Sequence, residues 1–128
     1  MSESNGYATK ASLLGNRQTR RYADVIVDGQ KFRLRSLNAL ESNTIQARML
    51  IEEEEDDRIR EIATANCRMI SQCVVDGNGD RLFSDDDIDA LAELDAAFVE
   101  RLARACRKHA EFDPGAVEKA EKNSEPTD

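Results

Sequence analysis

Alternating apolar and polar positions over residues 22–35 predict a β-hairpin. Two runs rich in β-branched and aromatic side chains flank Asp28-Gly29, a pair suited to the positive φ angles of a two-residue turn. With this turn, Val25 faces Phe32, and the apolar pairs gather on one side of the hairpin. A hairpin alone is marginally stable, so this side must pack on helices. Replacing Phe32 with Ala would then cost about 3–5 kcal/mol if its ring is fully buried.

Residues 38–74 carry apolar side chains at helical spacing. Asn38 can cap a first helix that has Glu41 at its third position, and the acidic run 52–57 leads into a second, more regular apolar pattern. The sequence leaves open whether these are two helices or one long bent helix. The apolar positions are Leu40, Ile45, Met49 and Leu50 in the first segment and Ile59, Ile62, Ala63, Cys67, Ile70 and Val74 in the second.

Residues 76–80 read Asp-Gly-Asn-Gly-Asp, which predicts a turn. Across this turn, residues 81–83 can pair with residues 73–75 in a second, smaller hairpin.

The same turn begins like the calcium-binding loop of an EF-hand. That loop needs Gly at its sixth position, but Arg81 stands there and brings a positive charge toward the ion. Its twelfth position, normally a bidentate Glu, holds a shorter Asp. A polar turn with a helix cap is therefore favoured over a metal site, whose candidate ligands are Asp76, Asn78, Asp80 and Asp87.

Two further helices are predicted after the turn. Ser84 and Asp87 match a capping box, and Asp95 can cap a last helix that ends at Asp113-Pro114. The apolar positions are Ile88 and Leu91 in the first of these helices and Phe98, Val99, Leu102, Ala103 and Cys106 in the second.

These elements predict a mainly α fold of the α+β class, with an N-terminal β-hairpin packed on a small bundle of about four helices. Residues 22–112 form a single folded domain, preceded by a flexible basic arm (1–21) and followed by a flexible acidic tail (113–128). The predicted core residues are Val25, Phe32, Leu34, Ile62, Ile70, Phe83, Leu91, Phe98 and Leu102.

The net charge of the chain limits the classes of partner that it can bind. The 128 residues carry a net charge of −8, which opposes general binding to nucleic acid because phosphate binding needs a positive surface. No run approaches the roughly 20 apolar residues of a membrane span, and the N-terminus lacks the pattern of a signal peptide. We therefore expect a cytoplasmic protein that binds other proteins, with no nucleic acid and no membrane partner.

Catalytic chemistry is not indicated. Cys67, Cys73 and Cys106 are an odd set within predicted helices, which favours buried thiols over disulfides or a metal site. His109 is the only histidine, and no Ser or Cys motif marks it as a catalytic base. We expect no enzyme activity and no cofactor.

The acidic run has two interpretations. It is either a solvated helix end or a docking strip for a basic partner, and the first is favoured because charge runs on surfaces are common. The candidate partner-binding residues are Glu52, Glu53, Glu54, Glu55, Asp56 and Asp57.

The order of these features resembles the tail assembly chaperones of long, non-contractile tailed phages. Each matching segment is weak alone, and the specificity comes from their order and spacing. The segments are the hairpin through residues 25–37, the helix with Glu41 and Arg48, residues 73–83, residues 84–91, and Glu121-Lys-Asn-Ser124.

This resemblance implies a non-catalytic protein of the host cell cytoplasm that is absent from the mature virion. It implies binding to the tape measure protein and help for the tail tube (major tail) protein as it polymerises around that client. Family members are often made in two lengths by a ribosomal frameshift, so a frameshifted long form of this chain, arising near Glu121-Lys122-Asn123, is a further expected partner. The alternatives are a calcium-binding module that uses the Asp76 loop and a structural head-tail connector.

Overall fold

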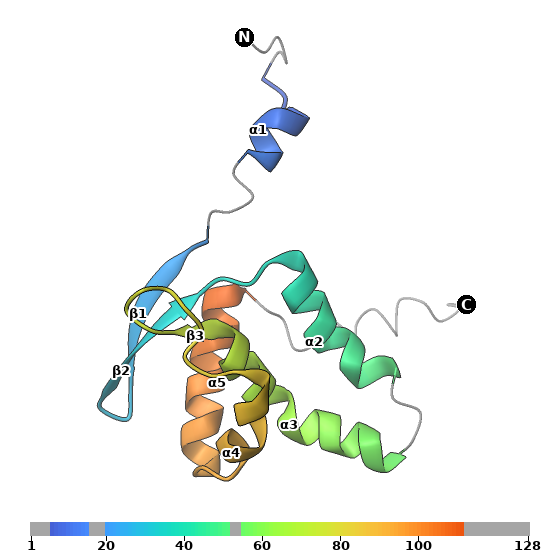
Figure 1. Cartoon of the computed structure of the whole chain (residues 1–128), viewed down its shortest axis with the longest axis vertical. Helices are drawn as coiled ribbons and strands as arrows, with labels where there is room; N and C mark the ends of the chain where they lie inside the picture. Colours follow the sequence, from blue (N-terminus) through green and yellow to red (C-terminus); the bar gives the residue numbers. More distant parts are fainter. Residues whose placement is uncertain (1–5, 16–19, 52–54, 112–128) are drawn as a thin grey trace, which may run out of the picture.

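The computed structural model describes residues 6–15, 20–51 and 55–111. Figure 1 shows a small antiparallel sheet beside a group of helices, which confirms the predicted mainly α fold with an N-terminal hairpin. The elements are α1 (Lys10–Leu14), β1 (Tyr22–Val27), β2 (Gln30–Arg35), α2 (Ala39–Ile51), α3 (Glu55–Cys73), β3 (Val74–Val75), the 3₁₀ turn η1 (Asp85–Asp87), α4 (Ile88–Ala92) and α5 (Ala96–Ala110).

β1 and β2 form the predicted hairpin. Asp28 and Gly29 occupy its turn with φ of 53° and 80°, the left-handed region that this turn requires. The register is the predicted one, with Val25 opposite Phe32. On the same face Leu34 is completely buried, so the apolar side of the hairpin does pack on the helices.

The sheet has a third strand, within residues 73–75 that were predicted as one arm of the second hairpin, but its pairing with β2 was not predicted. β3 pairs antiparallel with β2, with Val74 opposite Leu34 and Val75 opposite Arg33. The strand order is β1-β2-β3, so β2 is central and β1 is an edge strand. The predicted second hairpin is present as a bridge between Val75 and Arg81 and a backbone hydrogen bond from the Leu82 N–H to the Val74 carbonyl oxygen at 3.1 Å, on the edge of β3 that does not face β2.

Side-chain caps begin three helical segments as predicted. The Asn38 N–H donates to Glu41 Oε1 at 2.9 Å, and the Glu41 N–H donates to Asn38 Oδ1 at 2.8 Å, at the start of α2. Ser84 and Asp87 form the capping box of η1, and the carboxylate of Asp95 caps α5. These caps satisfy backbone N–H groups that a helix leaves without partners.

The ends of the described chain differ from the sequence pattern in two details. Thr9 and Ser12 form a capping box that begins α1, inside the predicted basic arm. α5 ends at Ala110, before Asp113-Pro114, because Glu111 adopts a left-handed conformation with φ of 56°. Residues 1–5, 16–19 and 113–128 lie outside the described residues, so the flexibility predicted for the basic arm and the acidic tail stays a prediction.

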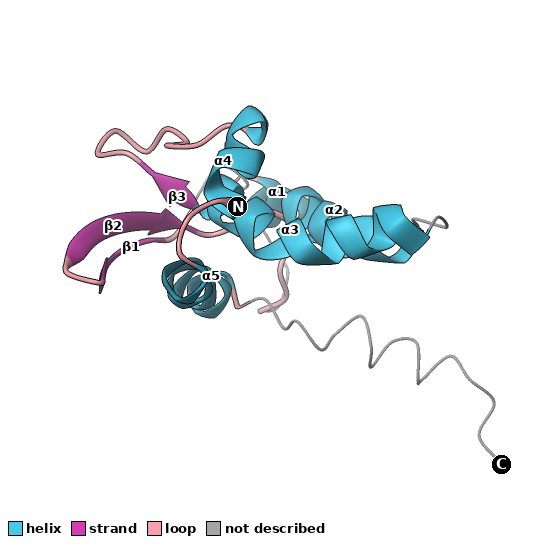
Figure 2. Ribbon diagram, turned by 90° about the horizontal axis from the view of Figure 1, so that it is seen from below, coloured by secondary structure: helices cyan, strands magenta, loops and turns pink. Residues whose placement is uncertain are grey.

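The core lies where the buried face of the sheet meets α3 and α5. Figures 1 and 2 show α5 lying against the sheet, and α3 packs against α5 and leads directly into β3. Seven of the largest fully buried side chains define this core: Leu34, Met69, Ile70, Cys73, Val74, Leu102 and Cys106.

One predicted core residue is wrong. Ile62 is 57% exposed, and Ile59 and Leu40, which share the predicted helical patterns, are exposed as well. The N-terminal half of α3 extends away from the sheet beside α2 (Figure 1), so only the C-terminal half of its apolar pattern reaches the core. Thr64 and Ser71, which the pattern does not select, are buried there instead.

An ion cluster joins the start of β1 to α2. Arg20 donates to both carboxylate oxygens of Glu41, at 2.8 and 3.1 Å, and Arg35 Nη2 lies 3.1 Å from Glu41 Oε2. Burial alone would raise the pKa of Glu41, but hydrogen bonds from Arg20 and the Asn38 N–H, with the charge of Arg35, bring that pKa below its usual value. Glu41 is therefore held as an anion.

Candidate partner-binding site

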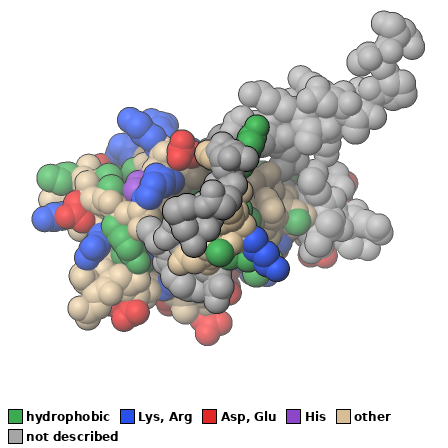
Figure 3. Space-filling view, turned by 90° about the horizontal axis from the view of Figure 1, so that it is seen from above, with side chains coloured by type: hydrophobic (Ala, Val, Ile, Leu, Met, Phe, Trp, Pro, Cys, Tyr) green, Lys and Arg blue, Asp and Glu red, His purple; other side chains and the backbone are tan. Residues whose placement is uncertain are grey.

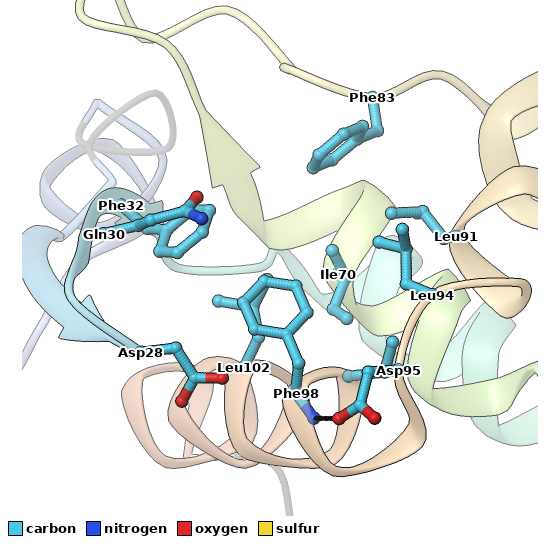
Figure 4. A pocket seen from close by; sticks show the side chains of 11 residues that line it. Asp28, Gln30, Phe32, Ile70, Phe83, Leu91, Leu94, Asp95, Phe98 and Leu102 are labelled. Atoms are coloured by element: carbon cyan, nitrogen blue, oxygen red, sulfur yellow. Dashed lines mark hydrogen bonds between the residues drawn. The ribbon is translucent and has the colours of Figure 1, made fainter.

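An apolar groove of about 500 Å³ lies between the hairpin, the loop after β3, α4 and the first half of α5 (Figure 4). Its size is in the range of pockets that accept small ligands or a few side chains of a partner. It is lined by Asp28, Gln30, Phe32, Ile70, Phe83, Leu91, Leu94, Asp95, Phe98, Val99 and Leu102.

Three aromatic rings shape the groove. The centroids of Phe32 and Phe98 are 6.1 Å apart with their planes tilted by 46°, a favourable geometry for an aromatic pair. Phe83 approaches from the opposite wall in Figure 4, on the loop that follows β3. All three rings are only partly buried, although they pack against the core. The groove is therefore a place where the core is left uncovered.

The two carboxylates at the rim already have partners. Arg101 donates from Nε and Nη2 to the two carboxylate oxygens of Asp28, both at 2.7 Å, and this hydrogen bonding lowers the pKa of Asp28. The Asp95 carboxylate accepts from the Phe98 N–H at 3.1 Å. Both carboxylates serve the fold, so the groove offers apolar contact instead of acid–base chemistry.

A local turn and a helix cap position two of the three rings. The Asp28-Gly29 turn fixes the register that places Phe32 on the inner face of β2. Asp95 starts α5 so that Phe98 stands in its first turn, facing Phe32. Each of these signals can be recognised in the sequence by itself, but the sequence does not show that the rings come together in one groove.

The predicted acidic run lies away from this groove. Residues 52–54 are outside the described residues, and Glu55, Asp56 and Asp57 are exposed in the first turn of α3. The 19 residues of α3 separate them from the sheet, a length of roughly 28 Å at the helical rise. The structure therefore does not bring the acidic run and the apolar groove together.

Two of the four candidate metal ligands, Asp76 and Asp87, already accept hydrogen bonds within the local structure. Asp76 Oδ1 accepts from the N–H groups of Asn78 and Asp80, at 2.8 and 3.1 Å, and Asp87 Oδ2 accepts from the Ser84 N–H at 2.8 Å. Within the described residues, no group of three His, Cys, Asp or Glu side chains is placed to hold a metal ion. The loop is built as a polar turn followed by a helix cap.

The three cysteines and His109, the remaining candidates for chemistry, occupy positions within the fold. All three cysteines are free and buried, and Cys73 Sγ lies 3.2 Å from the carbonyl oxygen of Arg35. His109 stands in the last turn of α5, with Nε2 3.0 Å from the carbonyl oxygen of Arg21. In the described part of the chain, no helix is both long and apolar enough for a membrane crossing.

Sequence reasoning assigned Phe32, Phe83 and Phe98 to the core and missed the groove that they line. The only signal was their type: three of the four phenylalanines of the chain stand in three separate elements. Leu94 was also missed, because it stands at a predicted helix break and not in an apolar pattern; it is 47% exposed at the edge of the groove.

No protein-family model matches the chain, and no curated protein matches it in sequence. Among solved structures, the chain is similar to the tail assembly chaperone of bacteriophage HK97, with a TM-score of 0.56 and 16% sequence identity. The likeness covers 78% of this chain and 98% of that chain. The chain thus has the fold of a phage tail assembly chaperone, in agreement with the resemblance seen in its sequence.

Proposed function

We propose that this protein is a non-catalytic tail assembly chaperone that binds the tape measure protein of its phage and promotes polymerisation of the tail tube protein around it. The observation that carries the proposal is the fold shared with the HK97 tail assembly chaperone. The proposed place of action is the host cell cytoplasm, and the protein is not retained in the virion.

The groove suggests how a client is held. A long helical client with one apolar face aggregates unless that face is covered, and the Phe32, Phe83 and Phe98 rings offer an apolar surface for a few of its side chains. Glu93 is exposed just after α4, next in the chain to Leu94 at the edge of the groove, whereas Asp89 on α4 is paired with Arg60. A client segment with Lys or Arg beside its apolar face fits this charge.

Binding has to be reversible, because the tube protein must displace the chaperone. A micromolar dissociation constant, equivalent to about −8 kcal/mol, would hold a client and still release it to a polymerising competitor. An open groove that buries few side chains is consistent with this range.

Co-expression with the tape measure protein of the same phage tests the proposal. We expect more soluble tape measure protein with this chain than without it, and a complex that co-purifies. If solubility is unchanged and no complex forms with the chain or any frameshifted form, the chaperone function is wrong. Detection of the chain in purified virions by mass spectrometry would instead favour the connector alternative.

The groove is tested separately with Leu94→Ser. The matched control is Ile62→Ser, an equally conservative change at an exposed position of α3 outside the groove. We expect Leu94→Ser to weaken co-purification of the client and Ile62→Ser to leave it unchanged. The reverse result would keep the chaperone function and move the client site to α3.

A further inference from the structure

A second apolar surface lies between β1 and α5, on the part of α5 that follows the groove. Two adjoining hollows of about 320 and 720 Å³ share Ile26, Val27, Ala105 and Lys108. Ile26 is 74% exposed, on the face of the hairpin opposite the core. We call this area the β1–α5 surface.

The β1–α5 surface is basic, although the whole chain carries a net charge of −8. Its cations are Arg21, Arg101, Arg104 and Lys108, and Figure 3 shows Lys and Arg side chains beside the single His of this region. Three of them have an acidic neighbour. Among the described residues, Lys108 has no ion pair. The surface therefore favours an acidic partner.

β1 is also an edge strand. An uncovered edge presents backbone N–H and C=O groups that can pair with another chain, and folded proteins often cover such edges with a further segment. Asp24, and Lys31 opposite Ile26, place a paired charge on the outer face of the hairpin, but Ile26 beside them is exposed. A further segment that packs along the edge of β1 would cover both this edge and the exposed Ile26.

The chain itself supplies a suitable segment. Residues 112–128 follow directly from Glu111, which lines the β1–α5 surface. They carry five acidic residues against two lysines, together with the apolar Phe112 and Val117. β1 is six residues long, roughly 20 Å, and 17 residues can extend to roughly 56 Å. The segment is therefore long enough to follow the strand along its whole length.

We propose that residues 112–128 dock on the β1–α5 surface of their own chain, with their apolar side chains on Ile26 and their carboxylates beside Lys108 and Arg104. The acidic segment then covers the edge of the sheet and neutralises the basic area. This inference does not depend on the proposed chaperone function, because it concerns contacts within one chain.

Paramagnetic relaxation measured by NMR on the full-length protein tests this docking. A nitroxide is attached at Ser124→Cys, since the three native cysteines are buried and do not compete for the label. We expect the amide signals of Ile26, Ala105 and Lys108 to lose most of their intensity when the label is oxidised, and to recover it in high salt, which screens the charges. Unchanged signals at these residues would overturn the proposal.

Charge reversal provides the matched control. Arg104→Glu with Lys108→Glu should abolish the loss of intensity. Arg60→Glu with Arg48→Glu changes the net charge equally and should preserve it, because both arginines lie outside the β1–α5 surface. Arg104 and Arg60 are comparable, since their side chains are 68% and 69% exposed and each has one acidic partner. If both pairs act alike, recognition by the basic surface is wrong.

A mixture of spin-labelled protein with isotope-labelled protein that carries no nitroxide distinguishes the two sources of the segment. Only contact between molecules can broaden signals in that sample. Broadening at Ile26 in the mixture would show that a second copy supplies the segment, and the intramolecular proposal would fail.

Discussion

Phe32→Ala gives a quantitative test of the open groove. Fully burying a large apolar side chain stabilises a protein by about 1.5–3 kcal/mol. The Phe32 ring is only partly buried, so removing it should cost somewhat less than this. Its removal also forfeits the pairing with Phe98, worth about 0.5–1.5 kcal/mol. The space left behind opens into the groove and adds little cavity cost. We therefore expect a loss of about 2–3 kcal/mol, below the 3–5 kcal/mol of a sealed site.

Urea unfolding followed by circular dichroism measures this loss as the change in the free energy of unfolding at constant m value. Two substitutions in the same hairpin bracket it. Leu34→Ala removes a completely buried side chain from the central strand and should cost about 3–5 kcal/mol. Ile26→Ala removes a side chain that is 74% exposed in the described residues, and in high salt, which releases residues 112–128 from it, should change stability by less than about 0.5 kcal/mol.

Two results would refute the reasoning. A cost for Phe32→Ala equal to that for Leu34→Ala would mean that the groove is closed in solution. A cost as small as that for Ile26→Ala would mean that the ring does not pack on Phe98. A double-mutant cycle with Phe98→Ala separates the pairing from the burial, and a coupling energy near zero would contradict the observed ring geometry.

Three further outcomes are expected. The lowered pKa of Glu41 stabilises the fold at pH values above its ordinary value of 4.5, and this stability is lost as the pH falls through the folded-state pKa; Glu41→Gln should remove that part of the acid dependence in urea titrations. Calcium should leave the melting temperature unchanged, because Asp76 and Asp87 already bind backbone N–H groups, and a rise with calcium would revive the metal site. The thiols should react with Ellman's reagent only after unfolding, because all three are buried; burial also raises the pKa of Cys67, and contact with Cys73 together with burial raises that of Cys106, whereas contact with Cys106 lowers the pKa of Cys73, which burial alone protects.

Local signals account for the parts of the fold that the sequence predicts correctly. The Asp28-Gly29 pair determines both the turn and the register of the hairpin, because its φ angles suit only a two-residue loop. The caps at Asn38, Ser84 and Asp95 act within three or four residues, so a single sequence is enough to find them.

The parts that were missed depend on contacts between distant segments. β3 is strand because Val74 meets Leu34, 40 positions earlier in the chain, and no local pattern marks this pairing. The groove exists because Phe83 stops short of Phe32 and Phe98, which is a matter of distance between three elements. Residue type indicates that each ring is apolar, but it does not show whether the core closes over it.

α3 shows the same limit within one helix and supports a last prediction. Its apolar pattern is continuous through Ile62 and Ile70, yet Ile62 is 57% exposed and Ile70 is completely buried. Ile70→Ala should cost about 2–5 kcal/mol, as for other buried aliphatic side chains. Ile62→Ala should cost less than about 1 kcal/mol, because little surface is buried there and Ala favours the helix.

The two α3 variants are compared in the same urea titration, with helix content at low denaturant as a control for local unfolding. A similar, large cost for both would mean that the N-terminal half of α3 is packed in solution, against its own chain or a second copy. Repeating the measurement at several protein concentrations separates these two cases, because only packing between copies depends on concentration. A small, concentration-independent cost for Ile62→Ala would agree with a half-helix that extends from the core and leaves Ile62 in solvent.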